Sequence, residues 1–159
     1  MIELRHAGIY VDDLEQAETF YMQCFSMEAI VHRQLVSNAL IDEIVGVGSK
    51  VLVSKLITPR GKMTGTGDMI ELLQVIDSKK KCAPPYGAVC QTGTAHIGIG
   101  IDDMVKTVIA ITENGGRQQT PILQLGNNRC CFCTDPEHNW LELIERNDGS
   151  RGNKTAPLK

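Results

Sequence analysis

The sequence predicts an α+β fold made of two similar modules, each running strand, helix and then three further strands. The first observation behind this prediction is an internal repeat: residues 6–14 (HAGIYVDDL) recur as residues 96–104 (HIGIGIDDM), identical at five of nine positions. A second similarity closes each copy, MIELL at 69–73 and WLELI at 140–144. Because the two matches come in the same order, duplication of one module explains them best.

Length and composition limit the class of protein. The chain has 159 residues and a net charge of -3, and it is 42% hydrophobic and 22% charged, which is ordinary for one globular domain and excludes disordered or fibrous material. No apolar run approaches the ~20 residues of a membrane span, and the N-terminus does not resemble a signal peptide. The weakly acidic charge and few aromatic residues argue against nucleic-acid binding. We therefore expect a cytoplasmic protein that acts on a small molecule.

Each opening strand alternates between an aliphatic face and a face that carries a histidine and glycine. In the first copy Ala7, Ile9 and Val11 lie opposite His6, Gly8 and Tyr10, and in the second Ile97, Ile99 and Ile101 lie opposite His96, Gly98 and Gly100. The aliphatic face needs a helix to cover it. The glycine face leaves room for a ligand beside the histidine.

A helix is expected after each opening strand. Asp12–Asp13 and Asp102–Asp103 are suitable N-cap residues, Asp12 with Glu15 fits a capping box, and Gly115–Gly116 ends the second helix. The expected apolar stripes are Leu14, Ala17, Phe20, Tyr21 and Cys24 in the first helix and Val105, Val108, Ile109 and Thr112 in the second.

Three strands complete each module. We expect them near 30–36, 47–57 and 68–76 in the first copy, with a hairpin loop over 59–67, and near 117–120, 128–134 and 139–146 in the second, with a tight turn at 135–139. The whole chain, 1–159, is then one domain comprising module one (about 4–76), a linker (77–93), module two (about 94–146) and a polar tail (147–159).

Six cysteines occur without the paired spacing of a zinc ribbon. In a cytosolic chain they are expected to behave as small apolar residues. The alternative is a redox-sensitive cluster at residues 130–133.

The residues that carry chemistry are His6, Glu71, His96 and Glu142. A glutamate in the middle of an apolar strand must be paired, bound to a ligand or exposed, because burying it unpaired costs several kcal/mol. Taken singly, each Glu could be an exposed edge residue and each His a hydrogen-bonded core residue. Taken together, two His/Glu pairs occupy equivalent places in two modules. If the modules meet face to face, two imidazoles and two carboxylates can hold a divalent cation.

These residues also carry a family resemblance. The opening repeat, and the segment 135–143 (DPEHNWLEL) beside a closing signature DPxGNxxEL, resemble the vicinal oxygen chelate (glyoxalase/bleomycin resistance/dioxygenase) superfamily over roughly 4–146. His138 stands where glycine is usual. The resemblance implies two βαβββ modules that form a cupped, partly open eight-stranded barrel around a metal site.

Within that superfamily the ligand order His6, Glu71, His96, Glu142 is similar to that of glyoxalase I. The resemblance then implies a homodimeric, metal-dependent lyase or isomerase with one divalent ion, Ni, Zn or Co. It would move a proton next to a carbonyl through an enediolate, with Glu142 as the base and Glu71 remaining bound or acting from the opposite face. The substrate would be the thiol adduct of a 2-oxoaldehyde, or an acyl-CoA. The sequence leaves open whether the two modules of a site come from one chain or from two.

Three alternatives compete with this interpretation. A methylmalonyl-CoA epimerase-like enzyme has the same pattern except for Gln at position 71. A drug- or toxin-binding protein has the same fold. An Fe(II) dioxygenase needs only three metal ligands, so the fourth candidate ligand counts against it. Further candidates are Glu43 as an extra acid or base, Arg33 and Arg129 as anion-binding groups, and Tyr10 as a pocket residue. Each of these four has an ordinary surface or core role as its alternative.

Overall fold

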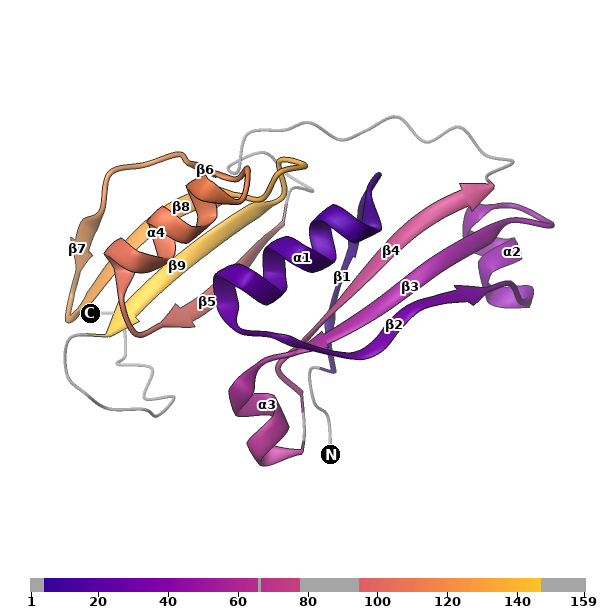
Figure 1. The fold of residues 1–159 in the computed structure, drawn as a ribbon, viewed down its shortest axis with the longest axis horizontal. Coiled ribbons are helices and arrows are strands. Elements are labelled where there is room, and N and C mark those ends of the chain that lie inside the picture. The colour runs from indigo at the N-terminus through magenta and orange to yellow at the C-terminus, as the bar shows by residue number, and fades with distance from the viewer. Residues whose placement is uncertain (1–4, 66, 78–94, 147–159) are drawn as a thin grey trace.

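The structure is a computed structural model that describes residues 5–65, 67–77 and 95–146. It contains the two predicted βαβββ units as two separate sheets, so the α+β class is confirmed (Figure 1). The predicted linker beyond residue 77, with its lysine run, and the predicted tail lie outside the described residues.

Module one forms a four-stranded sheet in the order β1-β4-β3-β2. Strand β1 runs parallel to β4, and the other neighbours are antiparallel. Its elements are β1 (Ala7–Tyr10), α1 (Leu14–Phe25), β2 (Glu28–Val36), α2 (Ala39–Val45), β3 (Lys50–Ile57), α3 (Pro59–Thr64) and β4 (Met69–Asp77).

Module two repeats this plan in a five-stranded sheet ordered β5-β9-β8-β6, with β7 paired to another part of β8. The parallel pair is again the first strand with the last. Its elements are β5 (His96–Ile101), α4 (Met104–Glu113), β6 (Arg117–Gln118), β7 (Leu123–Leu125), β8 (Asn128–Thr134) and β9 (Trp140–Arg146). The two sheets, of four and five strands, do not close into one barrel, and β7 is a strand that the sequence pattern did not predict.

Two short helices were also missed, and local capping explains both. Within the predicted hairpin loop, Thr58 accepts a hydrogen bond from the Gly61 amide and Pro59 begins α3. In α2, Asn38 accepts from the Ile41 amide. The buried residues of α2, Ile41 and Val45, pack on Val51 and Val53 of β3.

The predicted stripe of α1 is confirmed, whereas its capping residue and the stripe of α4 differ from prediction. Asp13, not Asp12, caps α1 by accepting from the Gln16 amide. In α4 the buried side chains are Met104 and Ile111, while Val105 and Ile109 are about half exposed. The buried face of α4 thus includes Met104 and Ile111, both of which the predicted stripe omitted.

The two modules share one hydrophobic core through their helices. Helices α1 and α4 pack against each other, and Figure 1 shows them next to one another, each along its own sheet. The core cluster includes Phe20 and Leu72 of module one together with Ile111 and Leu143 of module two. In each sheet, the face covered by α1 or α4 is therefore the one buried between the modules.

The turn at 135–139 of module two forms polar contacts with helix α1 of module one and with the residues just before it. Buried Asp135 accepts from the Tyr21 hydroxyl at 3.0 Å, and burial together with the Asp135 charge raises the pKa of Tyr21 well above its usual 10.0. The Glu137 carboxylate accepts from the amides of Asp12 and Asp13, both at 2.6 Å. A carboxylate at a helix start is favourable because it bonds amides that have no partner within the helix.

His138 is expected to be a site of backbone strain, because its φ is 69°, in the left-handed region that favours glycine. Both His138→Gly and His138→Ala remove the imidazole, but only glycine relieves this conformation. We expect His138→Gly to be more stable than His138→Ala by about 1 kcal/mol in urea unfolding. Equal stability of the two variants would contradict this account of the turn.

Glu145 makes the fold sensitive to acid. It accepts a hydrogen bond from Arg129 and another, at 2.7 Å, from the Met104 amide, and these bonds lower its pKa below the usual 4.5. Because the folded-state pKa is the lower one, the stabilisation is complete above the unfolded value and is lost as pH falls through the folded value. We expect Glu145→Gln to be less stable than wild type at pH 7, with the difference shrinking toward pH ~3. A constant difference across that range, measured by urea unfolding, would contradict the assignment.

The described cysteines behave as apolar residues. Cys24, Cys130, Cys131 and Cys133 are free, and burial raises the pKa of Cys24 and of Cys133 to about 12. Such thiols stay protonated and are poor nucleophiles, which disfavours a redox cluster at 130–133. Among the described residues, no helix is long and apolar enough to cross a membrane.

Candidate metal centre

The His/Glu pair of module one lies on the sheet face opposite α1. His6 directly precedes β1, and Glu71 lies in β4 beside Gly8, its register partner on β1. The distance from His6 Nε2 to Glu71 Oε2 is 3.2 Å. Lys55, the register partner of Glu71 on β3, places Nζ 3.0 Å from the other oxygen, Oε1.

Module two repeats the pair at the equivalent place. His96 begins β5, Glu142 lies in β9 beside Gly98, and His96 Nε2 lies 3.3 Å from Glu142 Oε2. A Cβ atom added at Gly98 would lie 3.8 Å from that oxygen, in van der Waals contact, so Gly98 lies directly beside the carboxylate. Phe132, opposite Glu142 on β8, contacts the His96 ring edge-on with 5.3 Å between ring centres.

Both pairs have the chemistry and spacing of two neighbouring ligands of a divalent ion. Two ligand atoms at ~2.1 Å from one ion lie roughly 3.0–3.5 Å apart in octahedral or tetrahedral geometry, and the observed separations are 3.2 and 3.3 Å. The side chains are accessible, with 39% of His6 and 42% of His96 exposed. Imidazole nitrogen and carboxylate oxygen are the donors that zinc, nickel and cobalt accept. The residues therefore fit a metal.

The structure does not bring the two pairs together within one chain. No group of three or more potential ligands able to hold a metal occurs among residues 5–65, 67–77 and 95–146. The shared core buries the α1 face of sheet one and the α4 face of sheet two, so each His/Glu pair lies on the face away from the other module. Within one chain the modules therefore meet through α1 and α4 and not through the faces that carry the His/Glu pairs.

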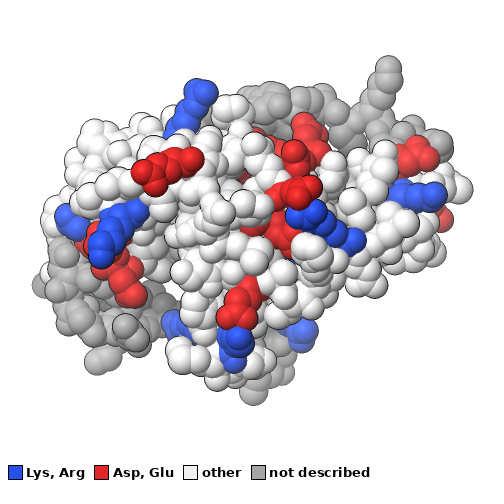
Figure 2. Space-filling view, viewed as in Figure 1, with Lys and Arg blue, Asp and Glu red and all other residues white. Residues whose placement is uncertain are grey.

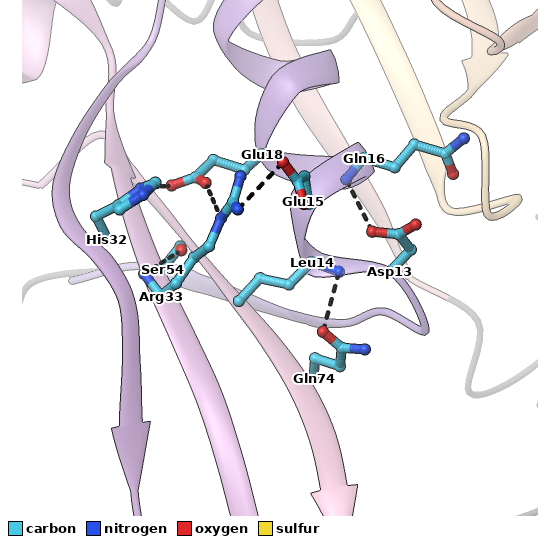
Figure 3. Close-up of polar contacts among 9 residues, drawn as sticks. All are labelled: Asp13, Leu14, Glu15, Gln16, Glu18, His32, Arg33, Ser54 and Gln74. Carbon is cyan, nitrogen blue, oxygen red and sulfur yellow. Dashed lines mark hydrogen bonds and ion pairs between the residues drawn. The ribbon is translucent and has the colours of Figure 1, made fainter.

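The two candidate arginines have structural partners away from these faces. Arg33 bonds Glu18 at 2.9 Å and pairs with Glu15, and Figure 3 shows buried Glu18 between His32 and Arg33. Arg129 pairs with Glu145 beneath the start of α4. Neither arginine is on the side of the sheet that carries a His/Glu pair. On the face drawn in Figure 2, acidic and basic side chains are interspersed, with no field of one sign.

Tyr10 and Glu43 have different relations to the candidate centre. Tyr10 is 50% exposed on the His6 side of β1, which agrees with a lining residue rather than a core one. Glu43 lies in α2. This helix packs against Val51 and Val53 of β3, on the same side of the sheet as Glu71.

Two neighbours of the candidate centre were missed by the sequence analysis, Lys55 and Phe132. Both lie on strands next to the glutamate-bearing strand and face the same side. An available signal was the isolated charge in the apolar run KVLVSKLI, residues 50–57. The partner of that charge depends on strand register, which the pattern alone does not fix.

The repeated βαβββ plan, with a His/Glu pair at the equivalent place in each module, is accompanied by a match to a known family. The model of the Glyoxalase/Bleomycin resistance protein/Dioxygenase superfamily matches residues 3–143, and the chain belongs to this superfamily. The vicinal oxygen chelate resemblance is thereby confirmed.

Several similar proteins are described as glyoxalases. The chain is 26% identical over 144 residues to a probable chloroplastic lactoylglutathione lyase from Arabidopsis thaliana, covering 89% of this chain but only 35% of that protein. Among solved structures it is similar to a glyoxalase family protein from Bacillus cereus (TM-score 0.79, 20% identity, 92% and 95% of the two chains covered). It is also similar to a glyoxalase I mutant from Zea mays (TM-score 0.61, 23% identity, 92% of this chain and 46% of that one). At these identities the solved structures establish the fold alone.

Proposed function

We propose that the protein is a divalent-metal-dependent lyase or isomerase of the glyoxalase I type. The observation that carries the proposal is the pair of equivalent His/Glu contacts, His6–Glu71 at 3.2 Å and His96–Glu142 at 3.3 Å, each on the sheet face opposite α1 or α4. Glutamate at position 71 favours a glyoxalase over an epimerase, and the similarity to a probable lactoylglutathione lyase supports the same class.

In this proposal His6, Glu71, His96 and Glu142 are the metal ligands. When bound, a divalent cation would polarise the substrate carbonyl and stabilise the negative charge that develops as the adjacent proton leaves. Glu142 takes that proton and returns it to the neighbouring carbon, which converts a hemithioacetal into a thioester without net oxidation. Phe132 and Tyr10 provide apolar surface beside the reacting group on the two modules.

The proposed active unit is a homodimer with shared sites. Because the pairs of one chain lie on faces turned away from each other, a complete ligand set needs module one of one copy and module two of another. Strands β1 and β5 are edge strands of their sheets; His6 directly precedes β1, and His96 begins β5. Bringing these edges together across two copies would place His6 and Glu71 beside the partner's His96 and the partner's Glu142.

The test is elemental analysis of the purified protein followed by two activity assays. We expect about one Ni, Zn or Co ion per chain, and thioester formation from the adduct of methylglyoxal with a thiol, removed by a chelator and restored by metal. Epimerisation of methylmalonyl-CoA instead would favour the epimerase alternative. A protein that binds metal or small molecules and turns over neither substrate would favour the binding-protein alternative.

A further inference from the structure

Lys55 distinguishes the two carboxylates of the candidate centre. Its Nζ lies 3.0 Å from Glu71 Oε1, while the other oxygen, Oε2, lies 3.2 Å from His6 Nε2. The contact is built into the sheet, because Lys55 and Glu71 are register partners on adjacent antiparallel strands with their side chains on one face. Glu71 is only 18% exposed and Lys55 37%, so the pair is shielded more than a surface ion pair.

The two oxygens of Glu71 therefore have separate partners. Oε1 forms an ion pair with the Lys55 ammonium group, and Oε2 is the oxygen next to the histidine nitrogen. A carboxylate can bind a cation through one oxygen or through both. With Oε1 held by Lys55, Glu71 offers one oxygen to a cation that His6 also contacts.

Among residues 5–65, 67–77 and 95–146, no lysine lies beside Glu142 as Lys55 lies beside Glu71. Phe132, its register partner on β8, occupies the place that Lys55 has beside Glu71. Among the described residues, the structure shows an ion-pair contact of Glu142 with His96 and with no lysine or arginine. The two equivalent glutamates thus have different neighbours on the adjacent strand, a lysine beside Glu71 and a phenylalanine beside Glu142.

We propose that Lys55 is a positioning residue that holds Glu71 as a one-oxygen metal ligand, which leaves Glu142 as the carboxylate free to move. The inference rests on the proposed function, since it assumes that a divalent cation binds at His6 and Glu71. It explains how two glutamates related by duplication could take different roles, one fixed and one mobile. Lys55 acts through Glu71 and does not itself touch the reacting atoms.

The experiment is a Co²⁺ titration of the wild type and three variants, Lys55→Met, Lys55→Arg and Lys106→Met, read by calorimetry and visible absorption. Lys106→Met is the matched control, because Lys106 is an exposed residue of α4 in module two and pairs with Asp103 at 3.6 Å. Lys55→Arg keeps the charge and a donor. Lys55→Gln replaces Lys55→Met if the latter does not fold.

We expect Lys55→Met to bind Co²⁺ at least ~10-fold more tightly, because a nearby positive charge is removed and Oε1 becomes a ligand. For the same reason its absorption per bound Co²⁺ should weaken, since Co²⁺ absorbs less as ligands are added. Lys55→Arg and Lys106→Met should stay within ~2-fold of wild type. A spectrum and an affinity of Lys55→Met equal to those of wild type, or weaker binding, would overturn the proposal.

These outcomes are distinct from failure of the proposed reaction. A wild-type protein that binds Co²⁺ yet forms no thioester would contradict the glyoxalase reaction. The comparison of Co²⁺ affinities and spectra between wild type and Lys55→Met would still decide the role of Lys55. A wild-type protein that binds no Co²⁺ would overturn both.

Discussion

Glu142→Gln should give a folded protein that retains metal but exchanges the α-hydrogen of its substrate into solvent at least ~100-fold more slowly than wild type. Glutamine keeps the shape of the side chain and a neutral oxygen that can still bind a cation. It cannot accept a proton, and its neighbour Phe132 offers no group that could replace it. Solvent exchange is followed by proton NMR in deuterated water, which isolates the proton-transfer step from product release.

Glu71→Gln is the matched comparison for this result. Because Lys55 holds one oxygen of Glu71, we assign Glu71 to binding, so its amide variant should lose metal affinity more than exchange rate in the metal-loaded state. If Glu142→Gln exchanged the hydrogen at the wild-type rate, Glu142 would be a structural ligand. The base would then have to be sought at Glu71 or Glu43.

His96→Ala should strip the bound metal. One of the two nitrogen ligands is lost. Removing even a residue that only orients a ligand typically costs roughly 10–100-fold in metal affinity, and losing the ligand itself should cost at least as much. Since metal binding stabilises the folded state by mass action, the melting temperature in excess metal should fall toward that of the chelated wild type. Elemental analysis and a thermal melt measure both effects.

His32→Ala is the control for His96→Ala. His32 also pairs with a glutamate, Glu18, at 2.8 Å, but on the helix-covered side of module one. We expect His32→Ala to keep its full metal content. An unchanged metal content and melting temperature in His96→Ala would remove His96 from the site.

Much of the fold could be predicted because the duplicated module repeats its physical signals. Alternation in residues 6–11 and 96–101 identified strands with one aliphatic face, and aspartates marked the helix starts. The missed elements depend on single capping contacts: Asn38 starts α2 and Thr58 starts α3, in segments too short for a hydrophobic period to appear. The wrong stripe in α4 arose because Val105 and Ile109 are as apolar as the residues that are buried.

The candidate site was predictable as residues but not as an arrangement. The sequence indicated His6, Glu71, His96 and Glu142 because burying a charged side chain in an apolar strand is costly unless that side chain is paired or bound to a ligand. How the modules pack depends on contacts between distant residues, such as Tyr21 with Asp135 and Glu137 with the start of α1. Such contacts have no local pattern, so the sequence left open whether one chain or two complete a site.

The shared site is the central claim, and mixing two inactive variants tests it most directly. His6→Ala damages only the module-one half of each site and His96→Ala only the module-two half. If sites are shared, unfolding and refolding the two together gives heterodimers in which one site of two is intact. Since half of randomly formed dimers are heterodimers, the mixture should regain roughly one metal ion per four chains and a quarter of wild-type turnover. A mixture that binds no more metal than either variant alone would contradict the shared site and place a complete ligand set in a single chain.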